Sequence, residues 1–401
     1  MRRILPLLCG LVLGAASAAQ SAPQGQQGSS TPTVKGVLDS SRTAVFETPR
    51  QSCDENDIPD AMARAFRDYT GTIHLAAAST DLFQSLGPTL ESVQHNCEAA
   101  YRSANDPNPA DFNDQVWIDS FYTVDGKHIA GLGHTEYHGW AIAGECHSQN
   151  YNECEYDSDT YHRSEDGGYH FNSRRAPANF LAGVPYEYRI DDGPTGYSVD
   201  SNIIQLGGWY YAMVTAWAWP PNCSGTQGAN KCVVPSGGGP MRTANVFDPS
   251  SWRGWSGTDF SVAFVDPYPG PVVHPKDHVY TPVQYMDVVT GINVFQSSNL
   301  VVATLWNPWD NEYGVRGLYF STSADLVNWT KPVLVATLQQ VLDQEPKGSW
   351  SYAYFSLIDP DAPDLNFSVI GDQPYLYYVR FENNGSDRVL FRQRVKLTLN
   401  Q

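Results

Sequence analysis

A strand-turn-strand pattern recurs along this chain, and the recurrence limits the possible folds more than any other feature. Residues 119–126 and 200–207 each open with Asp-Ser and close with Gly, seven positions after the Asp, and a hydrophobic strand follows each. Looser copies begin at Thr290 and at Ser356. Repetition of this kind is typical of folds that use one supersecondary unit several times.

A second recurring feature, a turn built around an aspartate, accompanies the hairpins. Residues 164–171 fit the pattern Ser-x-Asp-x-Gly-x-x-aromatic, residues 323–329 are a variant, and residues 248–252 and 79–82 occupy corresponding places. An Asp at such a position accepts backbone hydrogen bonds in a tight turn, so we assign these motifs a structural role. Together the two features predict a four-stranded antiparallel unit.

Such a unit, repeated about an axis, is a blade of a β-propeller. We therefore predict an all-β fold, a β-propeller of five four-stranded antiparallel blades. The first unit, residues 72–93, contains only the later strands of a blade, and the last unit, residues 355–399, contains only the early strands. We therefore expect the N-terminus to complete the last blade. Two helices are expected as exceptions: a short N-terminal one over residues 58–69, which follows a capping Asp and is rich in Ala, and one over residues 339–344.

The chain begins with a segment typical of a secreted protein. Residues 1–18 have a basic start, a short apolar run and a small-residue end, which is the pattern of a cleaved signal peptide. Residues 19–50 are predicted to be a linker, because their first half is rich in Ser, Gln, Gly and Pro. Residues 51–401 are expected to form a single propeller domain.

The cysteine content agrees with secretion. One of the seven cysteines lies in the signal segment, and the others favour disulfides in an oxidising compartment. Of the several pairings that the sequence allows, we favour the one between neighbours: Cys53–Cys97, Cys146–Cys154 and Cys223–Cys232. Four Asn-x-Ser/Thr sequons also permit glycosylation: Asn222, Asn328, Asn366 and Asn384.

Charge and aromatic content narrow the choice of partners. The formal net charge is -18, which argues against nucleic acid and anionic membranes, because both bind cationic surfaces. Aromatic residues make up 12% of the chain, and their flat faces suit a carbohydrate partner, although a large β-protein has a similar composition. We expect a monomer.

The hairpin at residues 115–140 carries the most distinctive side chains. Asp-Gly at positions 125 and 126, between apolar runs, predicts a tight turn. Alternate residues of a strand share a face, so His134, Glu136 and His138 are expected to point the same way. Two interpretations are open: a solvated strand end, or a functional site, since such groups are costly to bury unless they are paired or used.

At these hairpins the sequence resembles the secreted five-bladed propeller glycoside hydrolases, the arabinanase, xylosidase and invertase-like group. The resemblance rests on residues 117–119 (Trp-Ile-Asp) and 319–329, and as a pattern it extends over residues 70–400. It implies acidic residues on the innermost strands, two of which serve as acid and base. Asp119 matches the base position of one blade, and Asp200 matches the same position of the next.

The acid of these enzymes has no clear counterpart in this chain. The third hairpin has Thr290 at the matching place, and the nearest carboxylate, Asp287, comes before it. Glu136, on the same hairpin as Asp119, is the best remaining candidate. We therefore predict a glycoside hydrolase with Glu136, Asp119 and Asp200 as its catalytic residues. No cofactor is required, and a structural Ca²⁺ is compatible with this prediction.

Further side chains near the hairpin exits are candidates for binding the substrate: His134, His138, Tyr137, Trp140, Trp217 and Arg380. Three alternatives to hydrolysis stay open. A polysaccharide lyase on the same fold would use the His, Tyr and Arg side chains of this set. A lectin-like propeller would bind glycans without turnover, and a metal centre would combine His134, Glu136 and His138.

Overall fold

Almost every regular element of the described residues is a β-strand, as predicted. The computed structural model describes residues 31–150, 153–191, 193–218, 237–308, 314–342, 352–382 and 387–400, without the side chains of residues 217, 218 and 342. Their helical elements are short: α1 (Leu338–Leu342), η1 (Pro109–Asp111), η2 (Gly139–Ala141), η5 (Pro249–Ser251) and η6 (Pro275–His278). None of these helices has the length and apolarity needed to cross a membrane.

The strands form four sheets, whose order largely follows the chain. The first sheet contains β2 (Arg64–Arg67), β3 (Ile73–Ala76), β4 (Asp81–Gly87) and β5 (Gln94–Arg102). The longest contains β6 (Val116–Thr123), β7 (Ile129–His138), β8 (Glu155–Ser164), β9 (Asn172–Ser173), β10 (Phe180–Gly183), β11 (Thr195–Val199), β12 (Ile204–Leu206), β13 (Trp209–Ala218), β14 (Gly237–Thr243), β15 (Arg253–Gly254) and β16 (Val262–Ala263).

The remaining two sheets come from the second half of the chain and its N-terminal strand. One contains β17 (Val289–Phe295), β18 (Leu300–Asn307), β19 (Gly317–Ser323), β20 (Val333–Thr337) and the short β22 (Val369–Ile370). The other contains β1 (Thr33–Glu47), β21 (Tyr352–Ile358), β23 (Tyr375–Glu382) and β24 (Asp387–Asn400).

The longest sheet consists of two antiparallel runs, β6-β7-β8 and β11-β13-β14-β15-β16, joined by a short parallel contact between β8 and β11. Gly196 makes this contact possible, because a Cβ atom at that position would lie 2.2 Å from the carbonyl oxygen of Asp157. Its backbone also has a φ of 144°, which side chains disfavour. The described strands therefore fall into five successive antiparallel runs.

The hydrophobic core lies between consecutive runs, and the last run also packs against the first. Phe66 of β2 shares a cluster with Phe121 of β6, and further clusters join each later run to its successor. Leu75 of β3 and Tyr377 of β23 belong to one cluster, which connects the two ends of the series. Every run is thus covered on both faces, which explains why most strand residues are buried.

The helix predicted over residues 58–69 is wrong. Residues 61–66 are all buried, and β2 pairs with β3 through the register Arg64↔Ala76 to Arg67↔Ile73. Alanine has a high intrinsic helix propensity, but such propensities are small in free energy. Strand pairing within a core that covers both faces outweighs them. The first sheet therefore has four strands of its own, contrary to the expectation that the first unit supplies only later strands. The second expected helix is present as α1, and residues 343 and 344 lie outside the described part.

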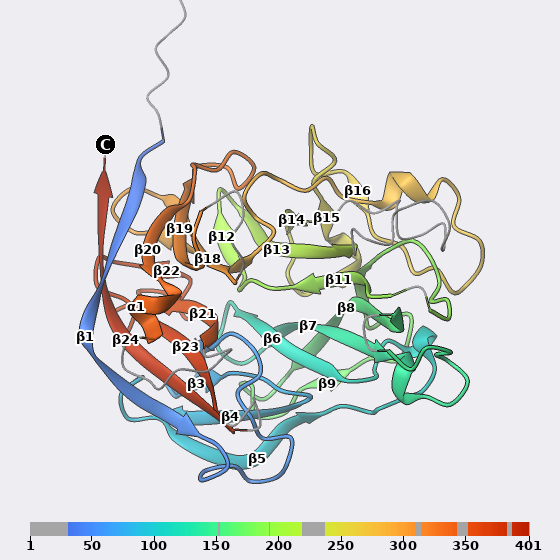
Figure 1. Ribbon diagram of the computed structural model, residues 1–401, viewed down its shortest axis with the longest axis horizontal. Helices are drawn as coiled ribbons and strands as arrows, with labels where there is room; N and C mark the ends of the chain where they lie inside the picture. Colours follow the sequence, from blue (N-terminus) through green and yellow to red (C-terminus); the bar gives the residue numbers. More distant parts are fainter. Residues whose placement is uncertain are drawn as a thin grey trace, which may run out of the picture. The chain divides into compact units, whose positions relative to one another are not determined.

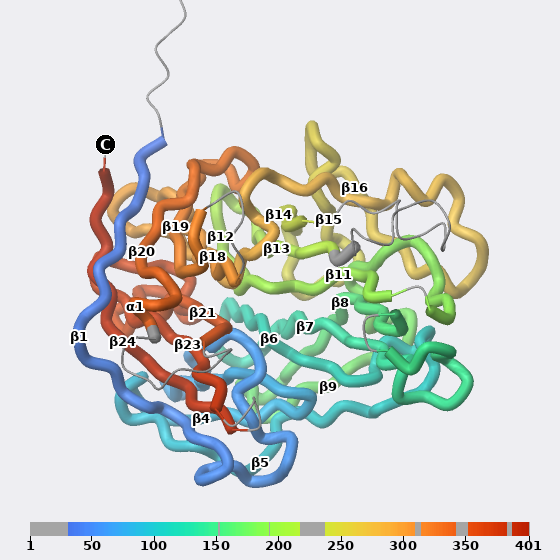
Figure 2. Tube along the Cα trace, viewed as in Figure 1, coloured from blue at the N-terminus to red at the C-terminus, as the bar shows by residue number. Residues whose placement is uncertain are grey.

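The N-terminal strand completes the last sheet, as expected. β1 pairs antiparallel with β24 from Thr33↔Asn400 to Glu47↔Val389. Figure 1 shows β1, in blue, running beside β24, in red, and the tube in Figure 2 shows the same neighbours. The linker predicted over residues 19–50 is therefore wrong for residues 33–47, because their alternating pattern pairs with a sheet edge.

The aspartate turns have the structural role assigned to them. In the motif at residues 164–171, Asp166 accepts a hydrogen bond from the backbone N–H of His170, at 3.1 Å. Asp325 accepts from those of Val327 and Asn328, at 2.9 and 2.7 Å. Each carboxylate thus closes the turn that separates two strands of a run.

Two of the three predicted disulfides are present, Cys53–Cys97 and Cys146–Cys154. The third, Cys223–Cys232, lies outside the described residues, as do the sequons at Asn222 and Asn384. Asn328 is exposed. Asn366 is buried, and its amide donates 2.9 Å to the carbonyl of Thr123 and accepts 2.7 Å from its N–H, so this sequon has no free amide for a glycan.

Candidate active site

Over three consecutive opposed pairs, one face of strands β7 and β8 carries only ionisable side chains. Residues directly opposite each other in an antiparallel pair lie on the same face. The opposed pairs are His134↔Asp159, Glu136↔Asp157 and His138↔Glu155. The prediction that His134, Glu136 and His138 share a face is confirmed. Their three acidic partners on β8 were not predicted, although the alternation Glu-Tyr-Asp-Ser-Asp at residues 155–159 is the sequence signal that marks them.

A chain of close contacts links this face to the neighbouring strand β6. His134 Nδ1 lies 3.4 Å from Asp119 Oδ2, and His134 Nε2 lies 3.5 Å from Glu136 Oε1. His138 Nε2 lies 2.8 Å from Glu136 Oε2. The ring of His134 is stacked on Trp117, with centroids 5.3 Å apart and an interplanar angle of 2°. The indole therefore fixes the imidazole between the two carboxylates.

Arg64, on β2, brings Asp119 and Asp200 to one point. Its guanidinium donates to the carbonyl oxygens of Asp119 (3.1 Å), Asp200 (3.0 Å) and Thr290 (2.9 Å). These are the equivalent positions of three successive hairpins, and the strand register shifts at Asp119 and at Thr290. Such bulges turn a backbone group and a side chain away from the regular ladder. Burial lowers the pKa of Arg64 to about 10, although the negative charges of Asp119 and Asp200 act to raise it. The guanidinium therefore stays a cation.

Three carboxyls of the cluster have raised pKa values. Burial, together with the negative charges of Asp200 and Asp119, raises the pKa of Asp159 well above its usual range. Burial and neighbouring carboxylates, Glu136 among them, do the same for Asp157. Burial raises the pKa of Asp200 to about 6, although Ser198 donates a 2.8 Å hydrogen bond to it. Burial therefore favours the protonated form of all three carboxyls.

Glu136 has the opposite electrostatic environment. Burial favours its neutral form, but hydrogen bonds and positive charge from His134 and His138 lower the pKa of Glu136 to about 2. Burial also opposes charge on His134, yet Asp119 and Glu136 raise the pKa of His134 well above its usual range. Glu136 is thus an ionised partner of two imidazoles, which disfavours its predicted role as the acid.

Solvent reaches the cluster from the end of β7. The side chains of Glu136 and His138 are 22% and 16% exposed, whereas that of Asp119 is 1% exposed. The exposed ring of Trp140 lies beyond them, 5.3 Å from the ring of His138. A ligand that entered along this side would meet Trp140 and His138 before Asp119.

A second ionic group, which sequence reasoning missed, lies within electrostatic range of Glu136. Arg388 donates a hydrogen bond to Asp60, and the Tyr354 hydroxyl donates another at 3.0 Å. Burial raises the pKa of Asp60, and the negative charge of Glu136 also raises it, whereas the positive charge of Arg388 lowers it. Asp60 falls in the stretch predicted as helix, which hid its position beside the innermost strands.

Two of the predicted substrate-binding residues, Tyr137 and Arg380, have other contacts in the structure, and a third, Trp217, is not tested. Tyr137 faces the other side of β7, where its hydroxyl donates 3.0 Å to the carbonyl of Pro107 and its ring packs on Tyr188. Arg380 instead pairs with Glu382 and packs over the ring of Phe391. The side chain of Trp217 is outside the described residues. The alternation of side chains along β7 already places Tyr137 opposite to its two histidine neighbours.

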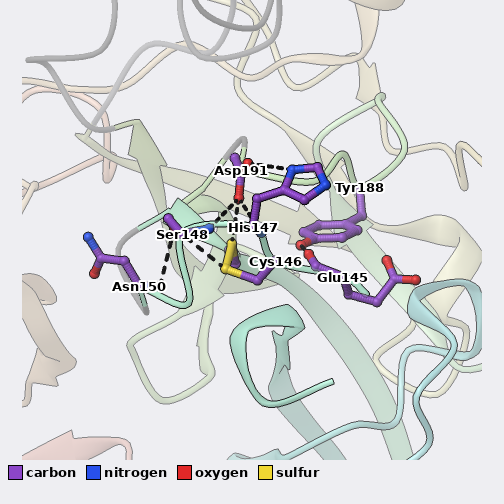
Figure 3. Close-up of a disulfide and its surroundings, with 8 residues drawn as sticks. Glu145, Cys146, His147, Ser148, Asn150, Tyr188 and Asp191 are labelled. Carbon is purple, nitrogen blue, oxygen red and sulfur yellow. Dashed lines mark hydrogen bonds and ion pairs between the residues drawn. A yellow bond between two sulfur atoms is a disulfide. The ribbon is translucent and has the colours of Figure 1, made fainter. Parts of the chain in front are cut away.

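The disulfide Cys146–Cys154 closes the loop between β7 and β8 (Figure 3). His147 next to it donates 2.9 Å from its backbone N–H to Asp191, and the Tyr188 hydroxyl donates to the carbonyl of Glu145. The loop therefore holds the ends of the two strands, which carry His138 and Glu155, in register. His138, Glu155 and Glu136 offer donor atoms within 4.8 Å of one another. The predicted metal centre, with His134 in place of Glu155, does not form such a group.

No protein-family model matches the chain, and comparison with curated proteins gives no match. Among solved structures, a putative glycosidase from Bacteroides thetaiotaomicron is similar with 10% identity and a TM-score of 0.45, over 88% of this chain and 91% of that one. A GH43 β-xylosidase/α-arabinofuranosidase from a compost microbial metagenome shares 11% identity, with a TM-score of 0.43, over 90% and 95%.

A sialidase from Trypanosoma rangeli is also similar, with 11% identity and a TM-score of 0.44, over 89% of this chain and 59% of that one. These three structures are thus similar to the chain at low sequence identity and with TM-scores below 0.5.

Proposed function

We propose that this protein is a secreted, monomeric glycoside hydrolase, that its five antiparallel runs are the blades of a β-propeller, and that Asp119 and Asp200 are its catalytic carboxyls. The observation that carries the proposal is the placement of two acidic residues at equivalent positions of successive hairpins, with the backbone carbonyls of both bound by the guanidinium of Arg64. The two disulfides support secretion, because disulfides persist in oxidising compartments.

The chemistry follows from the unequal environments of the two carboxyls. Glycosidic cleavage needs one protonated carboxyl to assist the leaving oxygen and one ionised carboxylate to activate water or attack carbon. Asp200, with its pKa of about 6, is the proton donor. Asp119, 3.4 Å from the positively charged His134, is the carboxylate. Asp159, opposite His134, interacts electrostatically with both of these carboxyls, so its protonation is coupled to theirs.

Glu136 keeps a part in this proposal, with a different role from the one predicted. Its ionised carboxylate positions His134 and, with His138, lies at the solvent side of the cluster. There Glu136 and His138 are placed to hydrogen-bond sugar hydroxyls, and Trp140 to stack on a ring. The lyase alternative loses support, because Tyr137 lies on the opposite face of the strand.

The test is a panel of plant, algal and microbial polysaccharides, with products identified by mass spectrometry. Hydrolysis adds the mass of water to the fragments, and elimination does not. We expect hydrolytic products from one class of glycan, and loss of turnover by a factor of about 10² to 10⁴ in Asp119→Asn and Asp200→Asn. Full activity in either variant, or products of elimination, would refute the assignment; saturable binding without product would indicate a lectin.

A further inference from the structure

The solvent side of the β7–β8 face has a donor arrangement of its own. Glu136, His138 and Glu155 each offer one ligand atom, and these atoms lie within 4.8 Å of one another. The closest pair, His138 Nε2 and Glu136 Oε2, is 2.8 Å apart. Around an ion with bonds of about 2.1 Å, ligands at right angles are about 3.0 Å apart, so the pair needs little movement to bind one ion.

A buried, unpartnered carboxylate oxygen lies on the same face of the two strands. Asp157 is 5% exposed, and its Oδ1 has no hydrogen-bond partner among the described residues. It lies directly opposite Glu136 in the strand register and on the same face, between Glu155 and Asp159. A buried acceptor without a partner costs about 1–3 kcal/mol, and more when charged, so this oxygen calls for a cation or a donor that protein atoms do not supply.

We propose that Glu136, His138 and Glu155 bind a divalent transition-metal ion, beside the buried carboxyl of Asp157 on the same face. Imidazole together with carboxylates is a donor set suited to Zn²⁺ or Mn²⁺, whereas Ca²⁺ prefers oxygen ligands alone. The ion neutralises carboxylates that the strand register forces side by side. It also fixes Glu136, which lies 3.5 Å from His134, so it orients the histidine that contacts Asp119.

The surroundings hold the ligands in place. The disulfide Cys146–Cys154 cross-links the second half of the segment between His138 and Glu155, and it ends at the residue directly before Glu155. The backbone N–H of His138 donates 3.2 Å to Asp114 at the end of β7. A site whose supporting residues fix its ligands loses less entropy on binding.

The inference does not depend on hydrolysis, because metal binding is measured without a substrate. Protein purified without chelator is analysed by inductively coupled plasma mass spectrometry, then stripped with EDTA and titrated separately with Zn²⁺, Mn²⁺ and Ca²⁺ while Tm is followed. We expect about one bound transition-metal ion per chain, and a rise in Tm for the stripped protein with Zn²⁺ or Mn²⁺.

Glu155→Gln and His138→Gln are expected to remove that rise in Tm. Two ligand variants are used because Glu155 is buried, and the Tm in EDTA shows that each folds. The matched control is His170→Gln, since His170 also lies between two carboxylates, Asp166 at 2.7 Å and Glu98 at 3.4 Å, but in an exposed turn. It should respond like the unaltered protein. No response to Zn²⁺ or Mn²⁺, a response to Ca²⁺ alone, or an unchanged response in both ligand variants overturns the proposal.

Discussion

Replacement of Asp200 by Asn is expected to abolish activity and, at neutral pH, to stabilise the folded chain. The pKa of Asp200 is about 6 in the folded protein, against an ordinary value of 3.8, because burial and the charge of Asp119 favour the protonated form more than His134 favours the ionised one. Folding therefore takes up a proton at this carboxyl between those two pH values, and stability falls as the pH rises through them.

The magnitude follows from the two pKa values. The step from 3.8 to about 6, at about 1.4 kcal/mol for each tenfold change in proton affinity, gives an upper limit of about 3 kcal/mol. Below pH 3.8 the carboxyl is protonated in both states and the penalty is absent; above pH 6 the penalty is fully present. Asn, which is neutral at every pH, avoids it. The charged groups around the site, Asp119, Asp159, His134 and Arg64, are the same in both proteins.

The assay is urea unfolding followed by tryptophan fluorescence at pH 4 and at pH 7.5, with turnover measured on the same preparations. We expect the stabilities of the two proteins to agree at pH 4 and the variant to be more stable by up to about 3 kcal/mol at pH 7.5. The unaltered enzyme should lose activity as the pH rises through about 6, because its proton donor ionises.

Asp325→Asn is the matched control with the opposite sign. Burial raises the pKa of Asp325, but hydrogen bonds from Asn328 and Val327 outweigh it and leave the pKa below 3.8. A lowered folded-state pKa contributes stability above the unfolded pKa and loses it at acid pH. This variant should be less stable than the unaltered protein at pH 7.5. A stability difference for Asp200→Asn that is equal at both pH values, or negative at pH 7.5, would contradict the reasoning.

Three further outcomes are expected. Arg64→Met leaves three buried carbonyl oxygens unpaired and should destabilise the chain by more than about 3 kcal/mol, measured by urea unfolding. Gly126→Ala places a Cβ atom 2.4 Å from a backbone nitrogen and should cost more than about 1 kcal/mol beyond Gly207→Ala, whose Cβ meets nothing within 4 Å. Replacing Cys146 and Cys154 by Ser should cost about 2.5 kcal/mol and weaken Zn²⁺ binding in calorimetry.

Local sequence rules predicted the parts of the site that lie on one hairpin. The Asp-Gly turn set the register of β6 and β7, and alternation then placed His134 and Glu136 on one face. The internal repeat made Asp119 equivalent to Asp200, and the hydrogen bonds of Arg64 to both confirm that equivalence. Each of these inferences needs only neighbours along the chain or the comparison of two copies.

The failures come from partners that are distant in sequence. Arg64 lies in an alanine-rich stretch that favours a helix when it is considered alone, and only its pairing with β3 and the carbonyls around its guanidinium make it part of a strand. Asp157 and Asp159 alternate visibly along the sequence, but nothing local says that β7 is their neighbour. Asp60 meets Arg388 across more than three hundred residues.

The protonation of a carboxyl is set by what lies opposite it, and this is why the catalytic roles that we propose differ from those that the sequence suggested. Glu136 and Asp200 are the same kind of group, and both are removed from bulk water. Glu136 lies between two imidazoles, which lower its pKa to about 2, whereas Asp200 lies near another carboxylate and keeps its proton up to about pH 6. Alternation fixes the face of a side chain but not the charge across from it, so sequence alone can collect the acids of such a site and cannot choose the donor among them.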